Sequence, residues 1–195
     1  MTISDLVDMR KLLGGATLVC VAVVIFGIHV QGVELGFNFD TYGLAGTAAG
    51  INWFIWGLFR TYLWRWKCFR GWLVRAPNFN GTWSGKLVWK DKVGNELRKN
   101  TKLEIKQTLT RITVDLSTDE TESGSEIAGI VSDDHRGTFA IDYTYRAEPS
   151  ILERDRNSVH YGAAHLKYSA RKDELSGSYW TDRSSKGSMK LKRKK

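Results

Sequence analysis

The fold of this chain is decided in residues 80–90, which read Asn80-Gly81-Thr82-Trp83-Ser84-Gly85-Lys86-Leu87-Val88-Trp89-Lys90. From Trp83 onward, apolar or small residues take every second position, and Lys86 and Lys90 stand between them. This alternation is typical of a β-strand with one face buried and the other in solvent. Pro77 precedes the stretch, and the apolar region before it shows no such period. The sequence therefore predicts two parts, a helical one at 1–75 and a β-rich one at 76–195.

The same alternation recurs along the whole second part, with turn-forming residues between most of the runs. The predicted strands are 81–90, 101–108, 111–118, 123–132, 136–146, 158–169, 174–182 and 187–193. Eight consecutive antiparallel strands with one apolar face close most simply into an up-and-down barrel, because closure removes exposed edges. A two-sheet sandwich is the alternative architecture. Eight strands enclose room for side chains or for one small ligand.

Two runs in the first part are long enough to cross a membrane. Leu12–Val33 has 22 residues without a formal charge, and Thr41–Phe59 has 19. A helix needs about 20 residues to span the hydrocarbon core of a bilayer. A cleavable signal peptide is the competing explanation, but the first run exceeds the apolar core of such a peptide and a second run follows. We therefore expect a hairpin of two transmembrane helices.

The charges that flank these runs predict the orientation of the hairpin. Arg10 and Lys11 precede the first run, five basic residues follow the second within 60–75, and the connecting residues 31–40 contain no Lys or Arg. The positive-inside rule then places both termini and the β-rich part in the cytoplasm, with the hairpin in the inner membrane. The residues expected to form an aromatic belt at the lipid surface are Trp53, Trp56, Tyr62, Trp64, Trp66 and Trp72.

The second run also contains a GxxxG motif, Gly46 to Gly50. Small residues at this spacing let helix backbones approach closely in lipid. One interpretation is packing of the two helices within one hairpin, and the other is self-association between protomers. The motif alone leaves both open.

The net charge of +8 comes from 29 basic and 21 acidic residues. Its basic clusters lie next to the second apolar run and at the C-terminus, which favours membrane topology and a solvated tail over binding of a nucleic-acid polymer.

Motifs for catalysis are missing from the sequence. It has no Gly-x-Ser-x-Gly, no phosphate-binding glycine loop and no metal-binding cysteine pair, so we expect neither an enzyme nor a cofactor or metal. His160 and His165 are five residues apart and should point to opposite faces of a strand. The acidic run at 119–122 is expected to be a solvated loop that binds calcium weakly at most.

The predicted barrel interior offers a candidate ligand site. Inward tyrosines and a tryptophan supply rings for stacking on nucleobases, and arginines near the barrel rim supply charge for phosphate. The predicted ligand-binding residues are Trp89, Gln107, Tyr143, Tyr145, Arg146, Tyr179 and Arg183. Arg154 and Arg156, in a loop at 147–157 that would form a lid, are further candidate cations. The opposing interpretation is that the tyrosines fill the core and satisfy their hydroxyl groups internally.

Two resemblances extend these expectations. The opening Asn80–Gly85 resembles the Gly-x-Trp start of lipocalin-like barrels, which implies that Trp83 plugs one barrel end. The order of elements resembles the two-transmembrane, β-strand-rich effectors associated with CD-NTases in bacterial CBASS antiphage defence. The segments 177–180 and 187–191 are similar to the closing hairpin of that family.

The second resemblance implies a function. A cyclic nucleotide second messenger from a partner CD-NTase would bind the barrel and drive homo-oligomerisation of the hairpins. The clustered hairpins would then permeabilise the inner membrane and kill the infected cell. Two other classes remain in competition: a membrane-anchored lipocalin-like carrier of a lipid or other apolar ligand, and a structural subunit whose barrel only docks other proteins.

Overall fold

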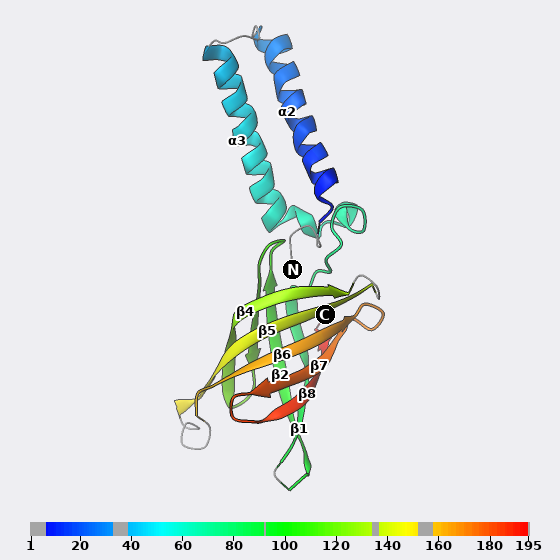
Figure 1. Ribbon diagram of the computed structural model, residues 1–195, viewed down its shortest axis with the longest axis vertical. Coiled ribbons are helices and arrows are strands. Elements are labelled where there is room, and N and C mark those ends of the chain that lie inside the picture. The colour runs from blue at the N-terminus through cyan, green and yellow to red at the C-terminus, as the bar shows by residue number, and fades with distance from the viewer. Residues whose placement is uncertain (1–6, 33–38, 92, 134–136, 152–157, 195) are drawn as a thin grey trace. The chain divides into compact units, whose positions relative to one another are not determined.

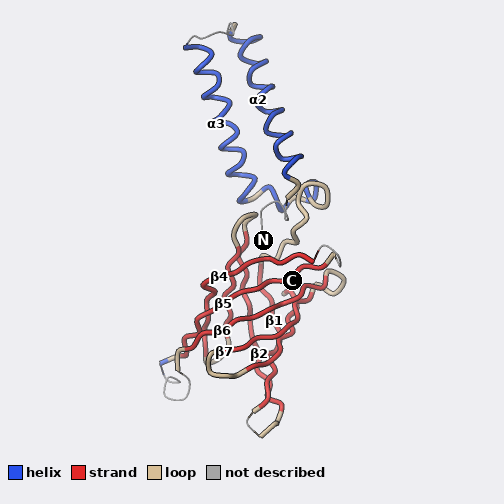
Figure 2. The backbone as a smooth tube through the Cα atoms, viewed as in Figure 1, coloured by secondary structure: helices blue, strands red, loops and turns tan. Residues whose placement is uncertain are grey.

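The computed structural model describes residues 7–32, 39–91, 93–133, 137–151 and 158–194. The chain divides into two compact units, Thr2–Ala76 and Pro77–Lys195. Helices make up the first unit and strands the second, as Figure 2 shows.

The second unit is a closed antiparallel barrel in which each strand pairs with the next and β8 returns to β1 (Figure 1). Its strands are β1 Gly81–Lys90, β2 Glu96–Gln107, β3 Ile112–Ser117, β4 Thr121–Asp133, β5 Thr138–Pro149, β6 His160–Ser169, β7 Glu174–Thr181 and β8 Lys186–Arg193. The predicted eight-stranded up-and-down barrel is confirmed, and the sandwich is excluded. β2 begins at Glu96 and not at residue 101, because its polar first residues still pair with β1 as far as Lys90.

The core lies inside the barrel and follows the predicted alternation. The inward side chains of Leu103, Ile141, Leu166, Leu175 and Leu191 are fully buried. Their burial removes apolar surface from water, which is the dominant favourable contribution to folding. Gly85 and Gly177 sit between backbone atoms of the neighbouring strands, where a Cβ would not fit.

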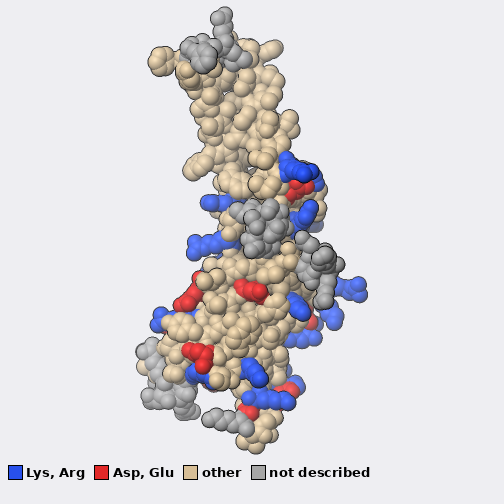
Figure 3. All heavy atoms as spheres, in the orientation of Figure 1, with Lys and Arg blue, Asp and Glu red and all other residues tan. Residues whose placement is uncertain are grey.

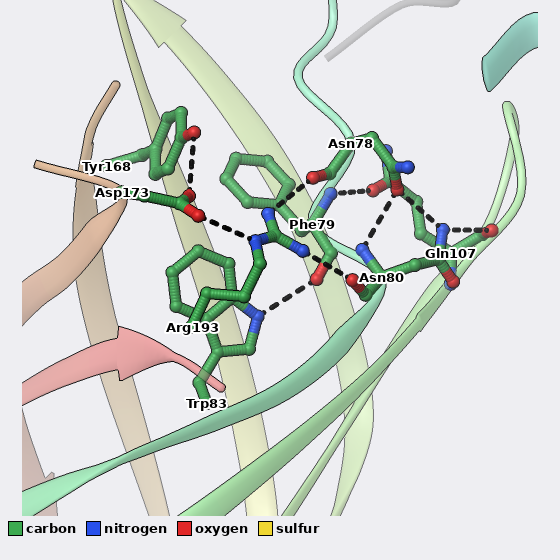
Figure 4. A network of polar contacts seen from close by, with 8 residues as sticks. All are labelled: Asn78, Phe79, Asn80, Trp83, Gln107, Tyr168, Asp173 and Arg193. Atoms are coloured by element: carbon green, nitrogen blue, oxygen red, sulfur yellow. Dashed lines mark hydrogen bonds and ion pairs between the residues drawn. The ribbon is translucent and has the colours of Figure 1, made fainter. Parts of the chain in front are cut away.

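One end of the barrel is closed around Arg193 (Figure 4). The guanidinium group lies over the ring of Trp83 at 4.3 Å. It also donates to Asp173 at 3.0 Å and to the carbonyl oxygen of Asn78 at 2.7 Å. Trp83 has no exposed surface, and its indole N–H donates to the carbonyl oxygen of Phe79 at 3.0 Å. Trp83 therefore plugs this end of the barrel.

Gln107 belongs to the same closed end. Its side-chain Oε1 accepts from the backbone N–H of Phe79 at 2.7 Å, and its Nε2 donates to the carbonyl oxygen of Pro77 at 3.2 Å. The backbone N–H of Gln107 donates to Oδ1 of Asn80 at 2.7 Å. The side-chain amide of Gln107 thus holds residues 77–79, which lead into β1, by hydrogen bonds.

The first unit contains the predicted helix pair, α2 Met9–Gln31 and α3 Phe39–Thr61, followed by two 3-10 turns, Leu63–Arg65 and Lys67–Phe69. Among the described residues, the single helix both long and apolar enough to cross a membrane is Met9–Val30. Glycine, threonine and asparagine lower the hydropathy of α3, so a second span stays a prediction. Figure 3 shows the visible face of both helices free of charged side chains along most of their length.

The two helices contact each other through Gly27 and Leu44. A Cβ at Gly27 would collide with the Leu44 side chain, and Ala48 is buried on the same face of α3. Gly46 and Gly50 lie on the other face, where an added Cβ would meet nothing within 4 Å. The interpretation that the GxxxG motif packs the hairpin together is therefore wrong.

The segment after α3 folds back onto the start of α2. The backbone N–H of Asp8 donates to the carbonyl oxygen of Leu73 at 2.9 Å, and Val7 forms a β-bridge with Val74. Trp64 is 1% exposed within this fold, so its side chain is not available to an aromatic belt. The belt residues Trp53, Tyr62, Trp66 and Trp72 are exposed.

Candidate functional site

The barrel end opposite the Arg193 network gathers aromatic and basic side chains. It is formed where β1, β3, β5 and β7 finish and the following strands begin. We call it the tyrosine end and define it by Trp89, Tyr143, Tyr145, His160, Tyr179 and Arg183. The first five lie at inward positions of their strands, and Arg183 lies in the turn between β7 and β8.

Two glycines make room for the rings at this end. A Cβ at Gly162 of β6 would collide with the Tyr145 ring and with the carbonyl oxygen of Trp180. A Cβ at Gly187 of β8 would collide with the Tyr179 ring. Each tyrosine therefore extends across a neighbouring strand, which is possible because that strand carries no side chain there. Gly187 also pairs with Trp89, so Trp89 and Tyr179 flank the same glycine.

Tyr143 is the deepest of the three tyrosines. It is 4% exposed, and its ring lies 5.8 Å from that of Tyr145. Its hydroxyl group is buried without a hydrogen-bond partner in the described part of the chain. A buried polar group left in this way costs about 1–3 kcal/mol. The interpretation that every inward tyrosine satisfies its hydroxyl internally thus fails at Tyr143.

All three tyrosines are held in the neutral form. Burial raises the pKa of Tyr143 and Tyr179 above the ordinary value. Burial, followed by the nearby Tyr179 and Asp182, raises the pKa of Tyr145 to about 12, although Arg183 opposes the shift. The phenol groups therefore keep their protons and can donate hydrogen bonds at physiological pH.

Arg183 and His160 form a basic pair at this end. Arg183 Nη2 lies 3.4 Å from His160 Nε2, and His160 Nδ1 lies 3.0 Å from the carbonyl oxygen of Ser158. Because a carbonyl oxygen can only accept, Nδ1 carries the proton, and Nε2 faces the guanidinium group as an acceptor. His160 and His165 do point to opposite faces, as their spacing predicted: His160 is inside, and His165 pairs with Asp142 outside.

The sequence interpretation missed two residues at this end. His160 was not among the predicted ligand residues, although it lies two residues before Gly162 and therefore on the same face of β6. Lys99 pairs with Leu87 and so faces inward, and its Nζ lies 2.6 Å from the carboxylate of Glu120. Extending the alternation of β2 back from Leu103 would have found Lys99, but the predicted strand began too late.

The structure thus brings together five of the seven predicted ligand residues: Trp89, Tyr143, Tyr145, Tyr179 and Arg183. Gln107 lies at the closed end, where its amide is already used. Arg146 is on the outer face of β5, where Nη2 lies 3.3 Å from Glu148 in a groove of about 830 Å³ over β2 to β5. The side-chain alternation that turns Tyr145 inward turns Arg146 outward. Arg154 and Arg156 lie outside the described residues.

Within the described residues, no three His, Cys, Asp or Glu side chains are grouped so that they could hold a metal ion. In the acidic loop that was considered for calcium, Glu120 is paired with Lys99.

The chemistry of the tyrosine end suits a planar, anionic ligand. Aromatic faces stack on nucleobases irrespective of base identity. Phenol hydroxyl groups and a guanidinium group donate hydrogen bonds to phosphate oxygens, and the guanidinium group does so bidentately.

Comparison with known proteins identifies the class. Residues 74–193 match the family model described as Cap15, cyclic dinucleotide receptor domain. The chain is also 30% identical over 137 residues to CD-NTase-associated protein 15 of Staphylococcus schleiferi, which covers 70% of this chain and 71% of that relative. The barrel is therefore a cyclic dinucleotide receptor domain. The chain belongs to the Cap15 family, and the resemblance to CD-NTase-associated effectors is confirmed.

Proposed function

We propose that this protein is a membrane effector of CBASS antiphage defence that binds a cyclic dinucleotide at the tyrosine end of its barrel. Binding drives homo-oligomerisation, and the clustered helical hairpins permeabilise the inner membrane. One observation carries the choice of site: the unpartnered Tyr143 hydroxyl lies beside the tilted ring of Tyr145, within a cyclic dinucleotide receptor domain.

The ligand is bound by stacking and by charge. The rings of Trp89, Tyr145 and Tyr179 take the bases, because they line the inward face next to glycines. Arg183 takes a phosphate, with His160 positioning its guanidinium group. Tyr143 donates its free hydroxyl to a base or a phosphate oxygen. A lipid carrier, the alternative, has no need of these donors.

The response to the ligand is assembly in the membrane. A ligand promotes assembly only if it binds the assembled state more tightly than the monomer. The apolar span of α2 is almost entirely exposed, as expected of a helix that crosses lipid. The open face of α3 at Gly46 and Gly50 allows close contact with a helix of another protomer. The basic residues at 60–75 keep the barrel in the cytoplasm.

The test uses the full chain in anionic phospholipid vesicles loaded with a self-quenching dye. Cyclic di-AMP, cyclic di-GMP and cyclic GMP–AMP are added, and binding is measured by calorimetry alongside dye release. At least one nucleotide should bind and release the dye. Nucleotide binding without dye release would contradict the proposed effector role. Failure of all three nucleotides to bind would contradict the proposed sensor role.

The assembly step has a separate test. Gly46→Leu combined with Gly50→Leu should leave nucleotide binding intact and abolish dye release. Gly14→Leu combined with Gly15→Leu adds the same bulk to open positions of α2 and is the matched control. If the Gly46 and Gly50 variant still permeabilised vesicles, this face of α3 would not be the assembly surface.

A further inference from the structure

The contact between β3 and β4 has fewer paired residues than any other contact between neighbouring strands of the barrel. It consists of three backbone pairs, from Asp115 with Gly124 to Ser117 with Glu122, whereas β4 and β5 pair along their full lengths. At the next position the backbone N–H of Val114 donates to the side-chain Oγ of Ser125 at 2.8 Å. A bulge follows between Ser125 and Ile127. Beyond it, β4 leaves β3.

An edge strand is therefore present within a closed barrel. Residues 127–132 of β4 pair with β5 on one side, and the described residues include no strand paired on the other side. Alternate N–H and C=O groups of an edge strand point away from the sheet and accept a further strand. Ile127 and Val131, on the outer face of this edge, are 73% and 41% exposed. Soluble proteins usually protect such edges with charged residues or proline.

We propose that a second copy of this chain adds its own β4 edge to this one, antiparallel and with a two-fold axis at Gly129. In this register Ile127 of each protomer lies opposite Val131 of the other, and Ala128 lies opposite Ile130. A shift of two residues would put the aliphatic side chains opposite glycine. The interface is isologous, since the same surface serves both protomers.

The sequence of the edge is complementary to itself. Glu126 lies opposite the neutral Ser132, so no like charges meet in the central pairs. Side chains directly opposite each other in an antiparallel sheet are in contact, so the paired aliphatic side chains stabilise the interface. The side chain that Gly129 lacks would meet nothing within 4 Å, which leaves the middle of the edge open to a second backbone.

The edge is also joined directly to the nucleotide site. Ala128 pairs with Tyr143, and Ser125 pairs with Tyr145. A ligand that repositions these tyrosines therefore acts on the strand behind the edge. The coupling to ligand rests on the proposed function, but the edge itself does not.

A cysteine at the two-fold position tests the interface. Gly129→Cys is introduced into the full chain with Cys20→Ser and Cys68→Ser, and the protein is reconstituted in vesicles. Mild oxidation with copper phenanthroline, with and without each cyclic dinucleotide, should yield a disulfide-linked dimer. Ser178→Cys, exposed on β7, is the matched control. If the Gly129→Cys variant cross-linked no more than the Ser178→Cys variant under every condition, the proposal would be overturned.

A pair of charge variants tests the register. Ile127→Lys with Val131→Lys opposes lysine to lysine, and should cause loss of the dimer and of dye release while nucleotide binding persists. Ile127→Lys with Val131→Glu opposes lysine to glutamate and should retain both. Equal loss of the dimer and of dye release in the two variants would contradict the proposed register. If the parent chain neither bound nucleotide nor released dye, the proposed function would be wrong. Cross-linking of the Gly129→Cys variant without nucleotide would still show whether the β4 edge is an interface between protomers.

Discussion

The ring of Tyr145 occupies the space that a side chain at Gly162 would need. The two residues are directly paired across β5 and β6, so the ring extends over its neighbour's backbone inside the barrel. Tyr179 repeats the arrangement over Gly187. The two glycines therefore determine where these rings can lie inside the barrel.

Gly162→Val should disable the receptor. Its side chain would collide with the Tyr145 ring and with the carbonyl oxygen of Trp180. We expect a loss of about 1–3 kcal/mol in the free energy of unfolding, as for other overpacked cores, together with loss of nucleotide binding. Urea denaturation and calorimetry measure the two effects. Gly124→Ala, where a Cβ would meet only the Asp115 side chain at an ordinary contact distance of 3.6 Å, is the control. Normal nucleotide binding by the Gly162 variant would argue against stacking on Tyr145.

Tyr143→Phe should have opposite effects on stability and on binding. Without nucleotide, removal of the unpartnered hydroxyl raises the free energy of unfolding by about 1 kcal/mol. With nucleotide, one hydrogen bond is lost, and binding weakens by about the same amount. Thermal unfolding with and without ligand shows both changes. A variant that bound nucleotide as tightly as the parent would show that the Tyr143 hydroxyl does not contact the ligand.

Arg183→Gln should weaken nucleotide binding by about tenfold to a hundredfold, because a hydrogen bond to a charged group contributes about 1.5–3 kcal/mol. The loss should shrink as salt is raised, since salt screens the charge interaction. Arg146→Gln removes an equal charge from the outer wall and should leave Kd unchanged. Equal weakening by both variants would point to long-range attraction and not to a contact with Arg183.

Alkaline pH should destabilise the barrel through Tyr145. Its pKa is about 12 in the folded chain and near 10 in the unfolded chain, so the folded state holds the proton more tightly. The resulting stability is complete below pH 10 and is lost as the pH rises from 10 through 12. Urea denaturation between pH 9 and 11 should show a shallower decline for Tyr145→Phe than for the parent. Identical declines would show that Tyr145 is not shielded from water.

The sequence predicted the barrel well because its signal is local. Alternation along each strand states which residues face the core, and turns mark the strand ends. The error at β2 arose where polar residues such as Asn100 carry no apolar signal although they pair with β1. The placement of the arginines was harder to predict: Arg146 and Arg183 look alike in sequence, but Arg146 lies on the outer wall and Arg183 lies in the β7–β8 turn beside His160.

By itself, the sequence determined the two-part organisation, the strand count and the inward facing of Tyr143, Tyr145 and Tyr179. Periodicity and charge distribution depend only on the order of residues along the chain, so they can be found without the structure. Only the tertiary structure decided that Gln107 lies at the closed end and that Gly46 and Gly50 face away from α2. It alone also showed that β4 leaves β3 after Ser125. These facts depend on the register between strands and on the rotation of one helix against another, and both are set by contacts between residues far apart in the chain.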